Sequence, residues 1–145
     1  MTIFVGADHR GFELKNELME YLQEKNIRVE DMGNYTLEPL DNFPEFGKKV
    51  AVAVAQKPDE FLGLLVCGSG IGMSIAANRV KGVRAGLCSS IRQVEHGRMN
   101  DHINVLCLAS DYLTFDEALG LVDTFIKTDI KKDEKYLLRS RQIDE

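Results

Sequence analysis

Cysteine is scarce in this sequence, and its spacing excludes two common uses of the residue. The 145 residues include three cysteines, which lie 21 and 19 positions apart. An odd number at such wide intervals suits neither a disulfide framework nor the close cysteine pairs of a zinc site. We therefore expect free thiols at Cys67, Cys88 and Cys107.

Long apolar runs, linkers and low-complexity tracts are also absent. No apolar run approaches the roughly 20 residues that span a bilayer, and Asp8, His9 and Arg10 interrupt the first ten positions, where a secretory core would begin. We therefore expect a cytoplasmic protein. With 44% hydrophobic residues and no Pro/Gly/Ser linker, the chain predicts a single domain over residues 1–145, with a helical tail from about residue 132.

Positive charge is in the minority. Lysine and arginine number 18 against 23 aspartates and glutamates, so the formal net charge is −5. Nucleic acid and anionic membrane surfaces both require a contiguous basic face, which makes them poor main partners for this chain. Any anionic ligand must be met by local positive charge.

Five short apolar or β-branched runs alternate with helical patterns. The expected strands are residues 2–7, 27–32, 61–66, 83–88 and 103–108, and the expected helices are 13–25, 45–56, 72–80, 90–98, 116–127 and the tail helix at 133–142. Strands and helices in this rhythm form right-handed βαβ units and a parallel sheet between helix layers. The sequence therefore predicts a doubly wound α/β fold, in which ligands bind beyond the carboxyl ends of the strands.

Two of the predicted strand-to-helix turns are chemically unusual. Ala7 to Gly11 carries an acid, a histidine and an arginine, and Cys67 to Gly72 carries a thiol, a hydroxyl and three glycines. The glycines let the backbone approach a ligand and point N–H groups at negative charge, or they simply permit a tight turn. A dinucleotide-binding site is a weaker interpretation of this loop, because Met73 stands at the last glycine position of that fingerprint. The loop also does not match the phosphate loop of NTPases, because it lacks the Gly-Lys-Ser/Thr ending.

Of the three cysteines, Cys67 has the most reactive setting. A thiolate beside a helix N-terminus is stabilised and can act as a base or nucleophile, whereas Cys88 and Cys107 fit a buried core. Asp8 and His9 follow a different strand, so an acid, a histidine, a thiol and an anion site can converge at one edge. The alternative is that Asp8 caps the first helix and His9 is a surface residue.

Three stretches together carry a resemblance to a known family: GADHRGFELK, VCGSGIGMSIAANRVKGVRAGLC and NVLCLAS. In order and spacing they resemble the ribose-5-phosphate isomerase B and galactose-6-phosphate isomerase family of sugar-phosphate isomerases. The resemblance covers nearly the whole chain. It implies a Rossmann-like three-layer αβα sandwich with a five-stranded parallel sheet, and a cofactor-free aldose–ketose isomerase of the pentose phosphate pathway. It also implies a homodimer or higher assembly with shared active sites.

The resemblance assigns roles to residues of the 67–72 loop. Cys67 matches the residue that takes the proton from C2 of the open-chain sugar, and Ser69 matches the hydroxyl that helps this transfer. Some members use a glutamate further along the loop, where this chain has Met73. The enediolate oxygen would be held by the backbone amides of Gly68, Gly70, Ile71 and Gly72.

Other matching positions concern the ring and the phosphate. Asp8 and His9 match a pair near the ring oxygen and the phosphate. The resemblance implies a catalytic role for Asp8 and a substrate-binding role for His9. Arg139 matches a phosphate-binding arginine that reaches a neighbouring subunit's site, with Arg10 or Arg141 as additional cations. Asn78 is expected to support the loop by hydrogen bonding. No metal or cofactor is expected.

Three positions depart from the family pattern. Asn100 stands where the family has the ring-opening histidine, and an amide cannot shuttle a proton, so His102 or His96 could replace it. Asp111 stands in place of a phosphate-binding arginine, and Tyr136 in place of a histidine. We expect conversion of ribose 5-phosphate to ribulose 5-phosphate. The alternatives are another aldose, such as an allose or galactose phosphate or an unphosphorylated sugar, and a non-catalytic sugar-phosphate sensor.

Overall fold

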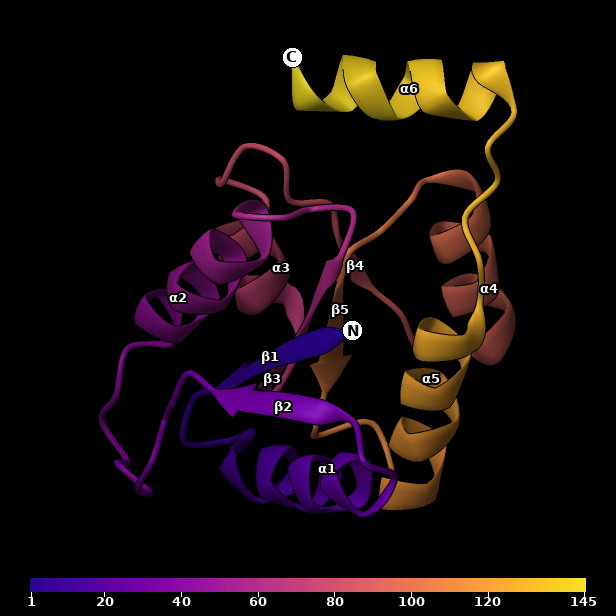
Figure 1. Cartoon of the computed structure of the whole chain (residues 1–145). Coiled ribbons are helices and arrows are strands. Elements are labelled where there is room, and N and C mark those ends of the chain that lie inside the picture. Colours follow the sequence, from indigo (N-terminus) through magenta and orange to yellow (C-terminus); the bar gives the residue numbers. More distant parts are fainter.

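Five parallel strands form one sheet in the order β2-β1-β3-β5-β4 in the computed structural model, which describes all residues 1–145 (Figure 1). The strands are β1 (Thr2–Ala7), β2 (Arg28–Asp31), β3 (Phe61–Cys67), β4 (Ala85–Leu87) and β5 (Val105–Ala109). The helices are α1 (Phe12–Glu24), α2 (Phe43–Ala55), α3 (Ile71–Ala77), α4 (Ile91–Asn100), α5 (Phe115–Lys127) and α6 (Glu134–Asp144). This is the predicted three-layer α/β fold with a five-stranded parallel sheet.

Helices cover both faces of the sheet, so two apolar clusters form the core. Alternate β1 residues point to opposite faces: Ile3 belongs to the cluster formed with α1, α4 and α5, whereas Phe4 belongs to the cluster formed with α2 and α3. The central strands read as continuous apolar runs because neither of their faces meets water. Helix α6 stands apart from these layers and lies beyond one edge of the sheet (Figure 1).

The region between α3 and β4 departs from the predicted boundaries. Helix α3 ends at Ala77, three residues before the predicted end, and β4 is three residues long, where six were expected. Asn78 forms two hydrogen bonds with the backbone of Ala85, accepting from its N–H at 2.8 Å and donating to its carbonyl at 2.9 Å. The predicted supporting role of Asn78 therefore acts on β4 instead of on the glycine loop.

Strand pairing brings three strand-to-helix turns together at the carboxyl edge of the sheet. Ala7 of β1 pairs with Val66 of β3, and Cys67 of β3 pairs with Ala109 of β5. The helix that follows each strand runs back across the sheet. The C-terminus of α4 therefore lies at the opposite edge, where the strands begin, and α6 lies beside this amino edge (Figure 1). No helix in the structure combines the length and apolarity needed to cross a membrane.

Candidate active site

The glycine loop after β3 surrounds a buried thiol. Cys67 is 5% exposed, and its Sγ accepts a hydrogen bond from the N–H of Gly70 at 3.2 Å. Ile71 donates its N–H to Ser69 Oγ, also at 3.2 Å. Two of the amides expected at the enediolate oxygen are therefore engaged with the thiol and hydroxyl, while those of Gly68 and Gly72 have no such role.

Gly70 is the residue that allows this loop to form. Its φ is +71°, a left-handed conformation that side chains disfavour. A Cβ atom at this position would lie 2.4 Å from Cδ1 of Leu87. Glycine is therefore required both by the backbone conformation and by the close packing of the loop against β4.

Cys88 and Cys107 are core residues, as predicted, and Cys67 belongs to the same apolar cluster as Cys107. Cys88 and Cys107 are 5% and 0% exposed, and all three cysteines are free thiols. Burial raises the pKa of Cys88 to about 11 and raises the pKa of Cys107 further. Because a thiol acts as a base only when ionised, neither is a candidate for proton transfer.

Asp8 holds the turn between β1 and α1. It is 6% exposed, and its Oδ1 accepts the N–H groups of Arg10 and Gly11, each at 3.0 Å. The N-cap of α1 is Gly11 and has no side-chain capping hydrogen bond, so Asp8 holds the turn before the helix and does not cap the helix itself. The hydrogen bonds of Asp8 also fix the backbone at His9, the next residue, at the same edge of the sheet as Cys67.

His9 is paired with a carboxylate that the sequence analysis missed. Its Nδ1 lies 2.8 Å from Oδ1 of Asp41, and its backbone N–H donates to the same oxygen at 3.1 Å. The second oxygen of Asp41 accepts from Nδ2 of Asn34 at 2.7 Å. Asp41 lies just before α2 and 32 residues from His9, so no local spacing pointed to this pair.

Burial and hydrogen bonding act in opposite directions on Asp41. Its side chain is only 6% exposed. Removal from water raises the pKa of this carboxyl, but hydrogen bonds from His9 and Asn34 lower it more, so that its net pKa lies below the ordinary value. Asp41 is therefore ionised near neutral pH and is held as an acceptor for His9.

Arg10 lies beside an acid, Asp111, which stands at the position of the family's arginine. Its guanidinium forms an ion pair with Asp111, which follows β5. A Cβ atom on Gly68 would lie 2.5 Å from Nε of Arg10, so the guanidinium lies directly against the glycine loop. Ser110 adds a hydrogen bond from its Oγ to the Arg10 carbonyl at 2.9 Å. Arg10 is thus near the loop, but the carboxylate of Asp111 offsets its positive charge.

One group of side chains has the composition of a cation site. Asp8, His9 and Asp41 each offer one possible metal-ligand atom, and these three atoms lie within 4.8 Å of one another. However, Asp8 Oδ1 is engaged by backbone amides, and the facing atoms of His9 and Asp41 are hydrogen-bonded to each other. The contacts therefore describe an Asp–His pair beside a turn that Asp8 holds by hydrogen bonds, and we assign no metal to it.

The remaining predicted residues lie at the amino edge of the same chain. Asn100 ends α4 and donates from Nδ2 to His96 Nδ1 at 3.0 Å. His102 is 3% exposed, with Nε2 2.8 Å from the Lys131 carbonyl and Nδ1 2.8 Å from Ser140 Oγ. Arg139 lies on α6, exposed, over the ring of Tyr136. One copy of the chain therefore does not bring these residues to Cys67.

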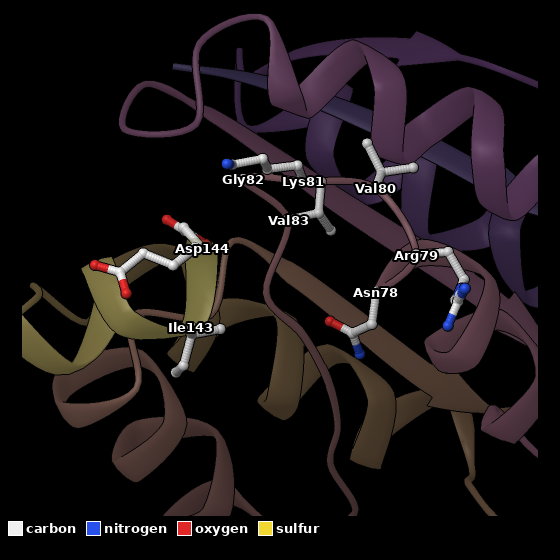
Figure 2. Close-up of a pocket in the computed structure, with 9 residues that line it drawn as sticks. Asn78, Arg79, Val80, Lys81, Gly82, Val83, Ile143 and Asp144 are labelled. Carbon is white, nitrogen blue, oxygen red and sulfur yellow. The ribbon is translucent and has the colours of Figure 1, made fainter.

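Cavities occur at both edges of the sheet. One of about 430 Å³ lies between the connection of α3 to β4 and the end of α6, and Figure 2 shows Arg79 and Lys81 on one side of it and Asp144 on the other. Of the residues singled out in the sequence, only Asn78 lines it. A second cavity, of about 320 Å³, is lined by Ser69, Leu87, Cys88 and Tyr112 and adjoins the glycine loop.

Comparisons with known proteins identify the family of this chain. Residues 3–143 match the family described as ribose/galactose isomerase. The probable ribose-5-phosphate isomerase B of Mycoplasma genitalium is 40% identical over 90% of this chain and 86% of that protein. Ribose-5-phosphate isomerase B of Escherichia coli is 37% identical over 86% of this chain and 82% of that protein.

Solved structures extend the agreement to three dimensions. The crystal structure of the M. genitalium ribose-5-phosphate isomerase B with bound ribulose-5-phosphate superposes with a TM-score of 0.94 at 37% identity, covering 98% of this chain and 93% of that one. The Thermotoga maritima ribose 5-phosphate isomerase superposes with a TM-score of 0.91 at 38% identity, covering 99% and 97%. This chain therefore belongs to the ribose/galactose isomerase family.

Proposed function

We propose that this chain is an aldose–ketose isomerase that converts ribose 5-phosphate to ribulose 5-phosphate through a cis-enediolate. The observation that carries the proposal is the ribulose-5-phosphate bound in the M. genitalium isomerase, whose fold this chain shares at a TM-score of 0.94. Cys67 and Ser69 stand in the ordered loop at the carboxyl edge of the sheet, which is where ligands bind in folds of this kind.

Cys67 is the base in this proposal. Its thiolate removes the proton from C2 of the open-chain aldose, and the negative charge moves to O1. The N–H of Gly70 stabilises the sulfur anion at 3.2 Å. The same proton, or one from water, then returns to C1 and yields the ketose, while the hydroxyl of Ser69 exchanges a proton between O1 and O2.

The amides of Gly68 and Gly72 supply donors for the developing oxyanion. Fixed donors aimed at a charge that forms only in the transition state contribute about 3 to 4 kcal/mol each. Gly70 and Ile71 contribute indirectly, because their N–H groups hold the thiol and hydroxyl in place. One loop thus serves both the base and the oxygen that becomes charged.

Two copies of the chain complete the site in this proposal. Asn100 and Arg139 belong to the amino edge, across the sheet from Cys67. A second copy would have to present its amino edge to the first copy's glycine loop for these residues to meet the substrate. We therefore propose a homodimer in which Arg139 of the second copy binds the phosphate.

A direct assay tests the function. The purified protein is expected to convert ribose 5-phosphate to ribulose 5-phosphate, and Cys67→Ala is expected to abolish turnover while circular dichroism remains unchanged. Cys107→Ala is the matched control, since this fully buried thiol lies in the apolar core and lines neither of the two cavities described above, and it should retain turnover. Near-normal turnover by Cys67→Ala would remove the proposed base.

One observation favours a second substrate class. The ion pair with Asp111 weakens the positive charge that Arg10 can offer a phosphate, which favours sugars that depend less on a dianion. A panel of ribose, allose and galactose, each with and without its phosphate, decides between the two. A higher kcat/KM for an unphosphorylated sugar than for ribose 5-phosphate would replace the first substrate.

A further inference from the structure

The proposed isomerisation leaves one proton transfer without a residue. Ribose 5-phosphate is largely a cyclic hemiacetal, and its ring must open before C2 lies next to a carbonyl. The position expected to carry this step is Asn100, whose side-chain amide cannot exchange a proton under these conditions. Both ring nitrogens of His102 are engaged by Lys131 and Ser140 in a buried contact, which leaves His9 and His96 as the available imidazoles.

His9 has the hydrogen bonding that is typical of a histidine that transfers protons. The donor on its Nδ1 is directed to Oδ1 of Asp41 at 2.8 Å, so the neutral ring has its lone pair on Nε2. The backbone N–H of His9 binds the same carboxylate oxygen. The side chain of Asp41 is 6% exposed and that of His9 is 34% exposed, so a buried carboxylate orients a ring that a substrate can reach.

Asp41 is itself fixed by a polar network. Asn34 donates to its second oxygen at 2.7 Å. The N–H of Asn34 donates to the Ala7 carbonyl at 2.9 Å, and its carbonyl accepts from Nζ of the fully buried Lys15 at 2.6 Å. The orientation of His9 is thus tied to α1 and to the end of β1, the strand that pairs with β3.

His96 has none of these features. Its side chain is 68% exposed, and the acid nearest to it, Asp101, is 3.8 Å away and 58% exposed. Its Nδ1 accepts from Asn100, at the C-terminal end of α4. No buried carboxylate fixes its tautomer.

We propose that His9 opens the sugar ring in this enzyme and that Asp41 is the positioning residue that holds His9 in the required tautomer. The inference rests on the isomerase function proposed above. Nε2 of His9 removes the proton from the anomeric O1, the C1–O4 bond breaks as C1=O1 forms, and O4 leaves with the bonding electrons. The imidazolium then gives its proton to O4, which shared C1 with O1 in the closed ring and so starts close to the same nitrogen, and His9 returns to its neutral form.

The test separates ring opening from isomerisation. Ribulose 5-phosphate cannot close a five-membered ring, because the oxygen on its C5 carries the phosphate. Exchange of its C1 proton for deuterium in D₂O, followed by NMR, therefore reports the chemistry of Cys67 without ring opening. The forward rate from ribose 5-phosphate requires both steps.

His9→Asn is expected to lower the forward rate by about 10² to 10⁴-fold, the usual contribution of a general acid–base group, while exchange with ribulose 5-phosphate changes by less than about threefold. Asp41→Asn, of the same size, is expected to lower the forward rate selectively by a smaller factor, as Asp41 acts through His9. At high concentrations of His9→Asn, the forward rate should stop rising with enzyme, because spontaneous opening in solution then supplies the substrate.

Two controls make the result decisive. Asp59→Asn makes the same chemical change on an exposed residue and should leave both rates unchanged, and His96→Asn should leave the ratio of the two rates unchanged. Equal losses of forward rate and exchange in both His9→Asn and Asp41→Asn, or a raised KM for both sugars, would overturn the inference in favour of phosphate binding. A selective forward loss in His96→Asn would overturn it in favour of that residue. Failure of the proposed function would instead appear as a wild-type protein that catalyses neither reaction.

Discussion

Replacement of Gly70 by alanine measures how strictly the glycine loop is built. Two costs add at this position: a positive φ of +71° and a Cβ atom 2.4 Å from Cδ1 of Leu87. Gly82 has a similar φ of +83° but nothing within 4 Å of its Cβ position, so Gly82→Ala is a matched control that contains only the backbone cost. That cost is about 1 to 2 kcal/mol for either residue.

The difference between the two variants isolates the steric contact. Overpacking in a filled site costs about 1 to 3 kcal/mol, so the free energy of unfolding of Gly70→Ala should fall below that of Gly82→Ala by about this amount. For a chain of this size each kcal/mol corresponds to about 2 to 4 °C in Tm. Each Gly→Ala substitution also lowers the conformational entropy of the unfolded chain by about the same amount, so this effect cancels when the two variants are compared.

Urea unfolding and thermal denaturation of both variants provide the measurement, with isomerase assays on the same samples. Gly70→Ala should also lose activity, because displacement of its N–H removes the hydrogen bond to Cys67 Sγ, whereas Gly82→Ala should keep it. Adding Leu87→Ala to Gly70→Ala should cost less than the sum of the two single changes, since it removes the atom that clashes. Equal stability of the two glycine variants would refute the packing argument.

Three further predictions concern charge and metal dependence. Asp111→Asn should lower KM for phosphorylated aldoses a fewfold and leave KM for unphosphorylated ones unchanged, since it removes the negative charge beside Arg10; equal shifts for both would contradict this. Asp41 has a folded-state pKa below its ordinary value, so its contribution to stability is present above about pH 4 and is lost as pH falls through the folded-state pKa. Urea unfolding between pH 3 and 6 should therefore show a flatter acid dependence in Asp41→Asn than in the wild type, and identical curves would argue against the paired carboxylate. Prolonged dialysis against EDTA should leave isomerase activity unchanged, and loss of activity that is restored by a divalent cation would reassign Asp8, His9 and Asp41 as metal ligands.

The core elements were predictable because their signals are local. The apolar run at residues 2–7 coincides with β1, and the stripe that includes Leu14, Leu18 and Leu22 gives α1 within one residue at each end. Buried strands need continuous apolar residues and amphipathic helices need a 3.6-residue period, so both patterns are readable without knowledge of the rest of the fold. Short elements such as β4 were less accurate, because side-chain contacts like those of Asn78 with Ala85 set their ends.

The glycine loop was also predictable in part. Positive φ at Gly70 and the thiol at the end of β3 follow from residues 67 to 72 alone. The acceptor role of Cys67 toward the Gly70 amide was not foreseen, nor was the use of the Ile71 amide by Ser69. Such contacts depend on the path of the backbone through the turn, which residue types constrain but do not specify.

By itself the sequence determined the α/β class, the strands and helices, the buried cysteines and the family, because each of these depends on periodicity or on motifs within one stretch of chain. Only the tertiary structure decided which distant residues meet: Asp41 with His9 across 32 positions, and Asp111 with Arg10 across 101. It also placed Asn100 and Arg139 at the edge opposite Cys67. The physical reason is that the order β2-β1-β3-β5-β4 sets which strand ends are neighbours, and the opposite direction of each crossover helix sets which edge its end reaches.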